Sequence, residues 1–126
     1  MEAVKAIFFL VRGMLRDRAT LALAEERSRM PFEECEIALA AIGDGAVVVV
    51  PFELFTEWGM EIKKHSPSLH TLLIELANGY SGYLPTRAAF SRAGGYETRT
   101  LRSSKLAPDA GELVVRAVSE MLNRLG

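Results

Sequence analysis

The chain has 126 residues, which is the length of about one domain and enough to bury a real core. Hydrophobic residues make up 49% and charged residues 25%, the balance of a soluble globular protein. The net charge of −1 argues against nucleic acid or an anionic membrane as a partner, and the single cysteine, Cys35, excludes an intramolecular disulfide. With only two histidines, His65 and His70, the chain is poorly supplied for a self-contained zinc site.

The N-terminal stretch from Val4 to Arg27 is predicted to be mostly helical. Its second part, Met14–Arg27, is rich in Ala, Leu, Arg and Glu, the residues with high helix propensity. Gly13 weakens the middle of the stretch, and the apolar run Ile7–Val11 also fits a strand, so both structures stay open for that run.

The apolar run Ile7–Val11 also bears on where the protein acts. It is short for the hydrophobic region of a signal peptide and far too short for a bilayer span, which needs about 20 apolar residues. We therefore expect a soluble, cytoplasmic protein without a membrane span.

As a helix, the run Ile7–Val11 presents more apolar surface than a small domain covers. We expect this segment to bind either a second copy of the chain, in a homo-oligomer such as a dimer, or a complementing polypeptide.

Two strands joined by a tight turn are predicted next. Residues Glu34–Ile42 carry apolar side chains at alternate positions, which is typical of a half-buried strand: Cys35, Ile37, Leu39 and Ala41. Gly43-Asp44-Gly45 is a hairpin turn signal. The β-branched run Ala46–Val50 fits a strand that is buried on both faces, so the two strands should pair as a hairpin.

A helix and a third strand follow Pro51. Residues Glu53–Lys64 have apolar side chains at helical spacing, and Thr71–Leu76 reads as the next strand. A strand, a helix and a strand in this order predict a βαβ unit, with Ala46–Val50 parallel to Thr71–Leu76 and a right-handed crossover. The predicted fold class is therefore α/β, a single domain over residues 1–126 with a small mixed sheet flanked by about three helices.

The stretch Ala77–Pro108 is polar and shows little hydrophobic periodicity. It contains all three tyrosines of the protein, and its aromatic content argues against disorder, so we expect a long ordered loop that carries a site. A final helix should open at Asp109 or Gly111, with an apolar stripe that faces the core. The members of that stripe are Val114, Val115, Val118, Met121, Leu122 and Leu125.

Candidate site residues follow the ends of the two parallel strands. Sites in α/β sheets form beyond the carboxyl ends of such strands, which predicts that Glu53, Asn78, Tyr80 and Tyr83 lie together and bind a cation or a polar ligand. Asn78 and Tyr80 are the candidates for substrate binding. The structural alternatives are that Glu53 stabilises the first turn of its helix, that the tyrosines anchor the loop, and that Asn78 satisfies backbone groups at the strand end.

The order of short motifs resembles the neutral/alkaline ceramidases and the bacterial ceramidase-like proteins, specifically the C-terminal part of their catalytic domain. The similarity covers the chain from about Ala19 to the C-terminus, and the combination of motifs is more specific than any one of them. The motifs are Ile42-Gly43-Asp44, Pro51-x-Glu53, Leu76-Ala77-Asn78-x-Tyr80-x-x-Tyr83-x-Pro85-Thr86-Arg87, Gly95-Tyr96-Glu97 and Leu106-Ala107-Pro108-x-Ala110-Gly111-Glu112.

The resemblance implies a zinc-dependent hydrolase that cleaves the N-acyl amide of ceramide. In the family, two upstream histidines, a glutamate and a tyrosine hold the zinc. By resemblance, the glutamate and the tyrosine fall on Glu53 and Tyr83. Tyr96 matches a catalytic tyrosine that binds the developing tetrahedral centre, which is the role of an oxyanion donor.

Two departures limit what the resemblance implies. Phe52 stands where the family usually has glycine, and the upstream histidine motifs are missing, because neither His65 nor His70 lies at a matching position. We therefore expect a ceramidase-like fragment with an incomplete zinc site that is inactive alone and binds no zinc alone. It would be a degenerate reading frame or one half of a split enzyme. The alternatives are a homo-oligomeric binding module that reuses the scaffold and, less favoured, an independent enzyme that uses Glu53 with the tyrosines.

Overall fold

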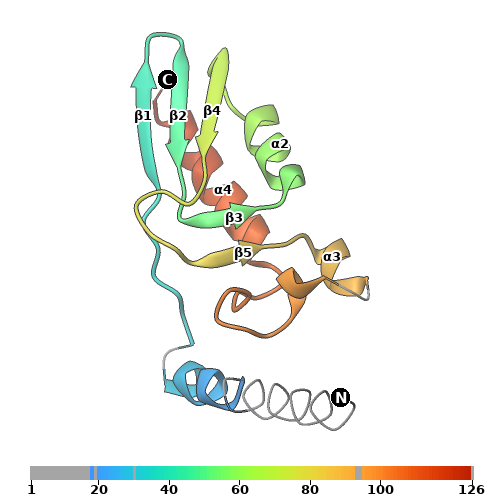
Figure 1. Ribbon diagram of the computed structural model, residues 1–126. Coiled ribbons are helices and arrows are strands. Elements are labelled where there is room, and N and C mark those ends of the chain that lie inside the picture. Colours follow the sequence, from blue (N-terminus) through green and yellow to red (C-terminus); the bar gives the residue numbers. More distant parts are fainter. Residues whose placement is uncertain (1–17, 19, 30, 93–94, 126) are drawn as a thin grey trace, which may run out of the picture.

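The computed structural model describes residues 18, 20–29, 31–92 and 95–125 (Figure 1). The predicted N-terminal helix is confirmed over residues 20–29. The helix or strand expected at Ile7–Val11, and its role in partner binding, lie outside the described residues. Within the described part, no helix is long and apolar enough to cross a membrane.

A three-stranded mixed sheet forms the upper part of the molecule in Figure 1. Strands β1 (Ala38–Ile42) and β2 (Gly45–Val49) pair antiparallel around a turn at Gly43, whose positive φ of 58° suits glycine. Strand β4 (His70–Ile74) runs parallel to β2 on its other side. The predicted hairpin, the parallel pair and the α/β class are therefore confirmed.

Strand β1 begins four residues later than predicted. Residues 31–37 are not in a strand, and Cys35 is exposed. The inward alternation nevertheless holds in part, because Ile37 and Leu39 pack against the core. Strand β2 is also less enclosed than predicted: Ala46 and Val48 are buried, whereas Val47 and Val49 on the other face are only partly buried.

A second sheet of two short parallel strands was not predicted. Strand β3 (Phe52–Leu54) pairs with β5 (Gly82–Leu84), and helix α2 (Thr56–Lys64) begins only after β3 ends. The prediction that a helix starts at Glu53 was therefore wrong. The alternative that Glu53 stabilises the first turn of that helix was wrong as well. Phe52 and Leu54 are buried on either side of a half-exposed Glu53, which is the period-2 pattern of a strand. Pairing with β5 stabilises the strand conformation over a helical one at these residues.

The stretch predicted as a loop contains short elements. Besides β5, it forms helix α3 (Arg87–Ser91) and the 3₁₀ helix η1 (Tyr96–Thr98). The Thr86 side chain caps α3 by accepting a hydrogen bond from the Ala89 N–H at 3.3 Å. The site-bearing segment is therefore built on pairing and capping rather than on irregular backbone alone.

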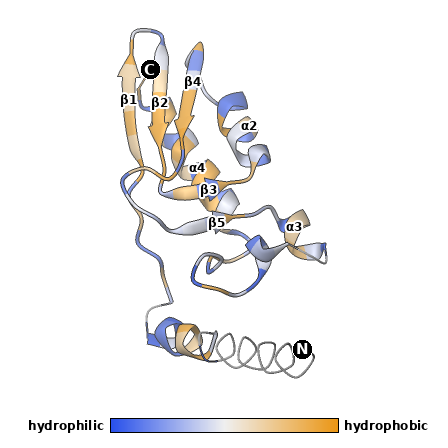
Figure 2. Ribbon diagram, in the orientation of Figure 1, coloured by the Kyte–Doolittle hydropathy of each residue, from blue (hydrophilic) through white to orange (hydrophobic). Residues whose placement is uncertain are grey.

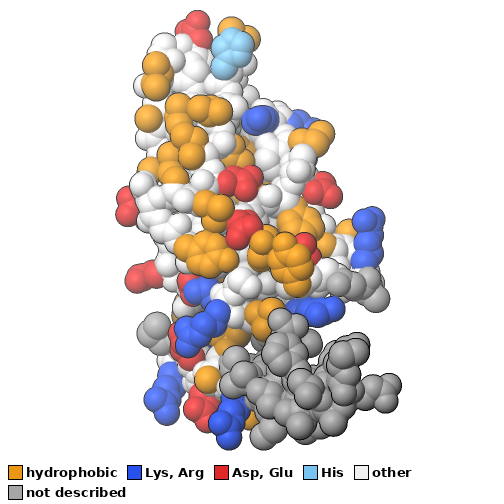
Figure 3. Space-filling view, in the orientation of Figure 1, with side chains coloured by type: hydrophobic (Ala, Val, Ile, Leu, Met, Phe, Trp, Pro, Cys, Tyr) orange, Lys and Arg blue, Asp and Glu red, His pale blue; other side chains and the backbone are white. Residues whose placement is uncertain are grey.

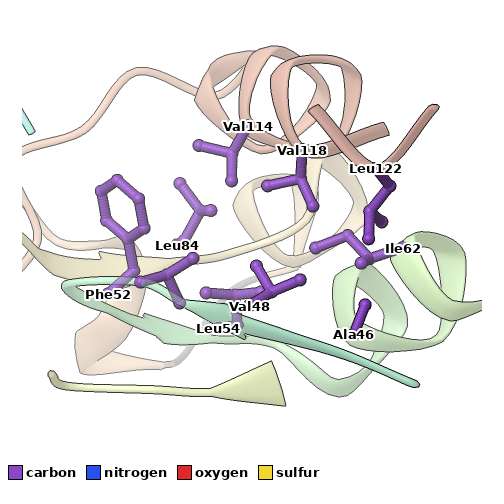
Figure 4. Close-up of a cluster of buried hydrophobic side chains, with 10 residues drawn as sticks. Ala46, Val48, Phe52, Leu54, Ile62, Leu84, Val114, Val118 and Leu122 are labelled. Carbon is purple, nitrogen blue, oxygen red and sulfur yellow. The ribbon is translucent and has the colours of Figure 1, made fainter. Parts of the chain in front are cut away.

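Helix α4 (Ala110–Asn123) closes the core from one side of the sheets, and it starts after Asp109 as predicted. Figure 4 shows its apolar stripe pointing at the strands and at Ile62 of α2. The buried cluster comprises Ala46, Val48, Val50, Phe52, Leu54, Ile62, Leu84, Val114, Val118 and Leu122. Both long helices, α2 and α4, thus pack on the same face of the sheets.

The contact between α2 and α4 depends on a glycine. A Cβ atom at Gly111 would overlap the indole ring of Trp58, so the missing side chain lets the ring lie on the first turn of α4. Close approach of this kind holds the two helices in one position over the core.

Gly111→Ala is predicted to destabilise the protein by about 1–3 kcal/mol, because the new methyl group has no room beside Trp58. Gly59→Ala is the matched control: its methyl would lie 3.4 Å from Leu73 Cδ2, an ordinary contact. Helix propensity there favours Ala by about 1 kcal/mol. Urea unfolding followed by circular dichroism compares the two, and an unchanged or higher stability of Gly111→Ala would contradict this packing.

Candidate functional site

The pairing of β3 with β5 brings two predicted site residues together. Glu53 lies opposite Tyr83 in the parallel register, between the pairs Phe52–Gly82 and Leu54–Leu84. The flanking pairs are buried, so both Glu53 and Tyr83 point away from the core, on the side opposite α4. A carboxylate and a phenol 30 residues apart in sequence are therefore neighbours on one face.

The segment 101–104 fixes the position of Tyr83. Gly82 has a φ of +89°, and a Cβ there would lie 2.6 Å from the Ser103 carbonyl oxygen. This close approach lets the Tyr83 N–H donate to the Ser103 carbonyl at 2.8 Å. The Ser104 hydroxyl donates to the carbonyl of Tyr96 at 3.1 Å, so the same segment also holds Tyr96 beside β5.

The three tyrosines and Glu53 form one connected group. The hydroxyls of Tyr83 and Tyr96 are 3.4 Å apart, and their rings meet edge to face with centroids 5.5 Å apart. The Tyr80 hydroxyl donates to Glu53 Oε1 at 3.3 Å. Tyr80 and Tyr96 remain more than half exposed, so the group lies open to a ligand.

The environment keeps two of these phenols protonated. The hydrogen bond with Tyr96, followed by the nearby Glu53 carboxylate, raises the pKa of Tyr83 well above its usual range. Partial loss of solvent, followed by the charge of Glu53 and the hydrogen bond to it, raises the pKa of Tyr80. A tyrosine with the ordinary pKa of about 10 is already protonated at neutral pH, and these shifts extend that hydrogen-bond-donor state to higher pH.

A hollow of about 370 Å³ lies beside this group. Four carboxylates line it with Tyr83, and no lysine or arginine of the described residues does: Glu53, Glu57, Glu75 and Glu97. Figure 3 shows acidic side chains interspersed with hydrophobic ones on the middle of this face. The hollow suits a cation or a ligand rich in hydrogen-bond donors.

Glu57, Glu75 and Glu97 were not singled out from the sequence. Glu75 directly follows β4, so the rule that sites lie beyond the carboxyl ends of parallel strands could have found it. One oxygen of Glu75 also accepts a hydrogen bond from the Leu54 N–H at 3.1 Å, which holds it over β3. No sequence signal pointed to Glu57, and Glu97 appeared only as a member of the motif Gly95-Tyr96-Glu97, with no role of its own.

Asn78 and the two histidines do not join the group. Asn78 is exposed in the left-handed region, with a φ of 61°, which asparagine tolerates and which fits its structural role in the turn. His65 lies at the C-terminal end of α2, about 14 Å along the helix axis from its start near Glu53. His70 begins β4, at the strand end away from Glu75. Neither imidazole is placed to share a metal ion with Glu53 and Tyr83.

A metal centre is not complete in the described residues. They contain no group of three or more His, Cys, Asp or Glu side chains arranged to hold one ion. Comparisons of the chain with models of protein families, with curated proteins and with solved structures found no match. The resemblance to the neutral ceramidases therefore rests on the sequence motifs alone.

The pKa of Tyr83 gives a test of the group. In a chain carrying Tyr80→Phe and Tyr96→Phe, Tyr83 is the only tyrosine. Its pKa should exceed the ordinary value of about 10 because Glu53 remains beside it. Adding Glu53→Gln should lower this pKa, whereas the control Glu61→Gln on α2 should not change it. The phenolate absorbance followed against pH measures the midpoint, and an equal midpoint with and without Glu53 would contradict the pairing.

Proposed function

We propose that this chain supplies one wall of an amidase site of the neutral ceramidase kind, and that another polypeptide supplies the rest. One observation carries the proposal: Glu53 and Tyr83 lie opposite each other on adjacent strands, with the Tyr96 hydroxyl 3.4 Å from that of Tyr83. These are the three residues to which the resemblance assigns the metal and oxyanion roles. Glu53 and Tyr83 line one hollow, and the hydroxyl of Tyr96 lies beside that of Tyr83, an arrangement that supports the resemblance.

The departure at Phe52 is compatible with such a site. Phe52 is only 2% exposed, and Figure 4 shows its ring among the core side chains. Because neighbouring residues of a strand point to opposite faces, the ring lies on the other side of β3 from Glu53. The bulk that replaces the usual glycine therefore takes no space in the hollow.

The donor set of the chain alone does not fit zinc. A catalytic zinc takes three protein ligands or more. Among the described residues no three His, Cys, Asp or Glu side chains are arranged to hold one ion, and both histidines are remote from Glu53 and Tyr83. Zinc binding is therefore expected of the family and, in this proposal, of the completed complex, and not of this chain alone.

The residues of this chain have separate roles in the completed site. The Tyr96 hydroxyl donates a hydrogen bond to the oxygen of the tetrahedral centre, where negative charge develops. Tyr80, oriented by its hydrogen bond to Glu53, lines the approach of the substrate, whereas Asn78 lies outside the group. Zinc, once bound, would polarise the amide carbonyl and activate water.

A homo-oligomeric binding module is the second candidate. The exposed apolar side chains of the three-stranded sheet favour it, since such a surface commonly marks an interface between chains. A mass of 13.9 kDa by light scattering would exclude it, and twice that mass would support it.

A complementation experiment tests the first proposal. The isolated chain should neither hydrolyse a fluorescent N-acyl sphingosine nor hold zinc in stoichiometric amount. Co-expression with the histidine-bearing part of a bacterial neutral ceramidase, truncated before its own equivalent segment, should restore hydrolysis and zinc. Tyr96→Phe should then lower kcat by about 10²–10³-fold, as the loss of an oxyanion donor does.

Glu53→Gln should abolish zinc retention in that complex, whereas Glu61→Gln on α2 should leave it unchanged. Hydrolysis by the isolated chain, or zinc retention that does not depend on Glu53, would contradict the proposed roles.

A further inference from the structure

Within residues 20–29, 31–92 and 95–125, no helix covers one face of the three-stranded sheet. The outer sheet face is the side of β1, β2 and β4 opposite the core helices, and its side chains occupy the positions that alternate with the buried ones. They are all apolar, with His70 at the rim: Ala38, Ala40, Ile42, Val47, Val49, Leu72 and Ile74. Ile42 is 69% exposed and Leu72 57%. Figure 2 shows the hydrophobic strands, and Figure 3 shows hydrophobic side chains gathered over the upper part of this view.

The outer sheet face continues into the glutamate-lined hollow. Within each strand the buried residues are the even-numbered ones, so Val47 and Val49 lie on the outer side of β2 and Glu53 on the outer side of β3. The two strands are separated by a bend at Pro51, which is itself buried. On the neighbouring strand, Ile74 is followed by Glu75 and then by Leu76, both of which line the hollow. The apolar surface and the half-complete site are thus parts of one continuous surface.

The size of the outer sheet face limits what can cover it. Three strands spaced about 4.8 Å apart and five residues long, at about 3.3 Å per residue, give a face of roughly 14 by 17 Å. Its plan area of about 240 Å² is far below the roughly 800 Å² that each partner buries in a standard interface. A stable partner must therefore extend beyond this face, and the hollow at the end of β4 is the surface that adjoins it.

Charge argues against a second copy as that partner. A symmetric pair of identical chains that covers both regions sets either hollow against hollow or hollow against apolar sheet. The first arrangement faces carboxylates with carboxylates, and the second buries them against apolar side chains. Both are unfavourable because, in the part of the chain that the structure describes, no lysine or arginine lines the hollow. A different chain with basic side chains meets neither problem.

We propose that the outer sheet face and the hollow form one docking surface for a different polypeptide. That polypeptide lays an apolar surface on Val47, Leu72 and Ile74 and presents histidine or other basic side chains to the four glutamates. The inference rests on the proposed function, because a site with two of its metal donors needs the others from outside. The complementing chain would thus bind at the outer sheet face and the hollow, through a contact surface that is apolar in one part and basic in the other.

Site-specific photocrosslinking tests the docking surface. The full chain is expressed in the cells that carry its gene with p-benzoylphenylalanine in place of Leu72, or in place of Leu113 on α4 as a control of similar exposure. Position 72 should give an adduct with one different protein, identified by mass spectrometry of the joined peptides, and position 113 should not.

The purified partner then gives the affinity. Leu72→Lys should weaken its binding to this chain at least 10-fold, while Leu113→Lys should change binding by less than 2-fold, because only the first charge enters the apolar contact. An adduct between two copies, an adduct within one chain, no adduct, or equal effects at both positions would overturn the inference.

Zinc retention by the purified complex separates this inference from the proposed function. Loss of zinc with Glu53→Gln supports both. A complex that forms through position 72 but holds zinc independently of Glu53 supports the docking surface and removes the proposed metal role.

Discussion

The short parallel pairing of β3 with β5 is the constraint on which the rest of the structure depends. The two strands are anchored by side chains buried in the core: Phe52, Leu54 and Leu84. Backbone bonds extend the pairing at both ends, from the Ser81 N–H to the Pro51 carbonyl at 2.7 Å and from the Phe55 N–H to the Leu84 carbonyl at 3.3 Å. The connection after β4 and the segment 101–104 are both held against this pair, so the positions of all three tyrosines follow from it.

The packing of the helices explains why the functional features lie on one side. Helices α2 and α4 cover the face that buries Val48 and Leu54, and the opposite face carries the apolar sheet surface together with Glu53 and Tyr83. The elements in the described part of the chain cover only one face of its sheets. The docking surface that we propose would combine the uncovered apolar surface with Glu53 and Tyr83 on the other side.

The sequence predicted those parts of the fold that have strong local signals. The β-branched run, the Gly43-Asp44-Gly45 turn and the period of α4 lead to the hairpin, the parallel pair and the final helix, which the structure has. Strands β3 and β5 were missed because three residues are too few to establish a period, and Phe52-Glu53-Leu54 fits a helix start equally well. Only the tertiary contact between β3 and β5 decides whether these residues form a strand or the start of a helix.

The candidate site was predictable to a similar degree. The rule about strand ends correctly brought Glu53, Tyr80 and Tyr83 together, although it placed Glu53 on the wrong element. Asn78 follows the same strand but points into solvent, because a left-handed turn intervenes. The proximity of Tyr96 and Glu97 depends on how the segment from 95 to 104 folds back, and no local sequence signal encodes that.

The central claim is that Glu53, Tyr83 and Tyr96 meet across β3 and β5, and NMR of the isolated chain tests it most directly. The structure predicts nuclear Overhauser effects between the backbones of Glu53 and Tyr83 and between the rings of Tyr83 and Tyr96, whose centroids are 5.5 Å apart. It also predicts slow exchange of the Tyr83 amide, which donates to Ser103. Spectra that show the β1–β2 hairpin but none of these contacts would contradict the account.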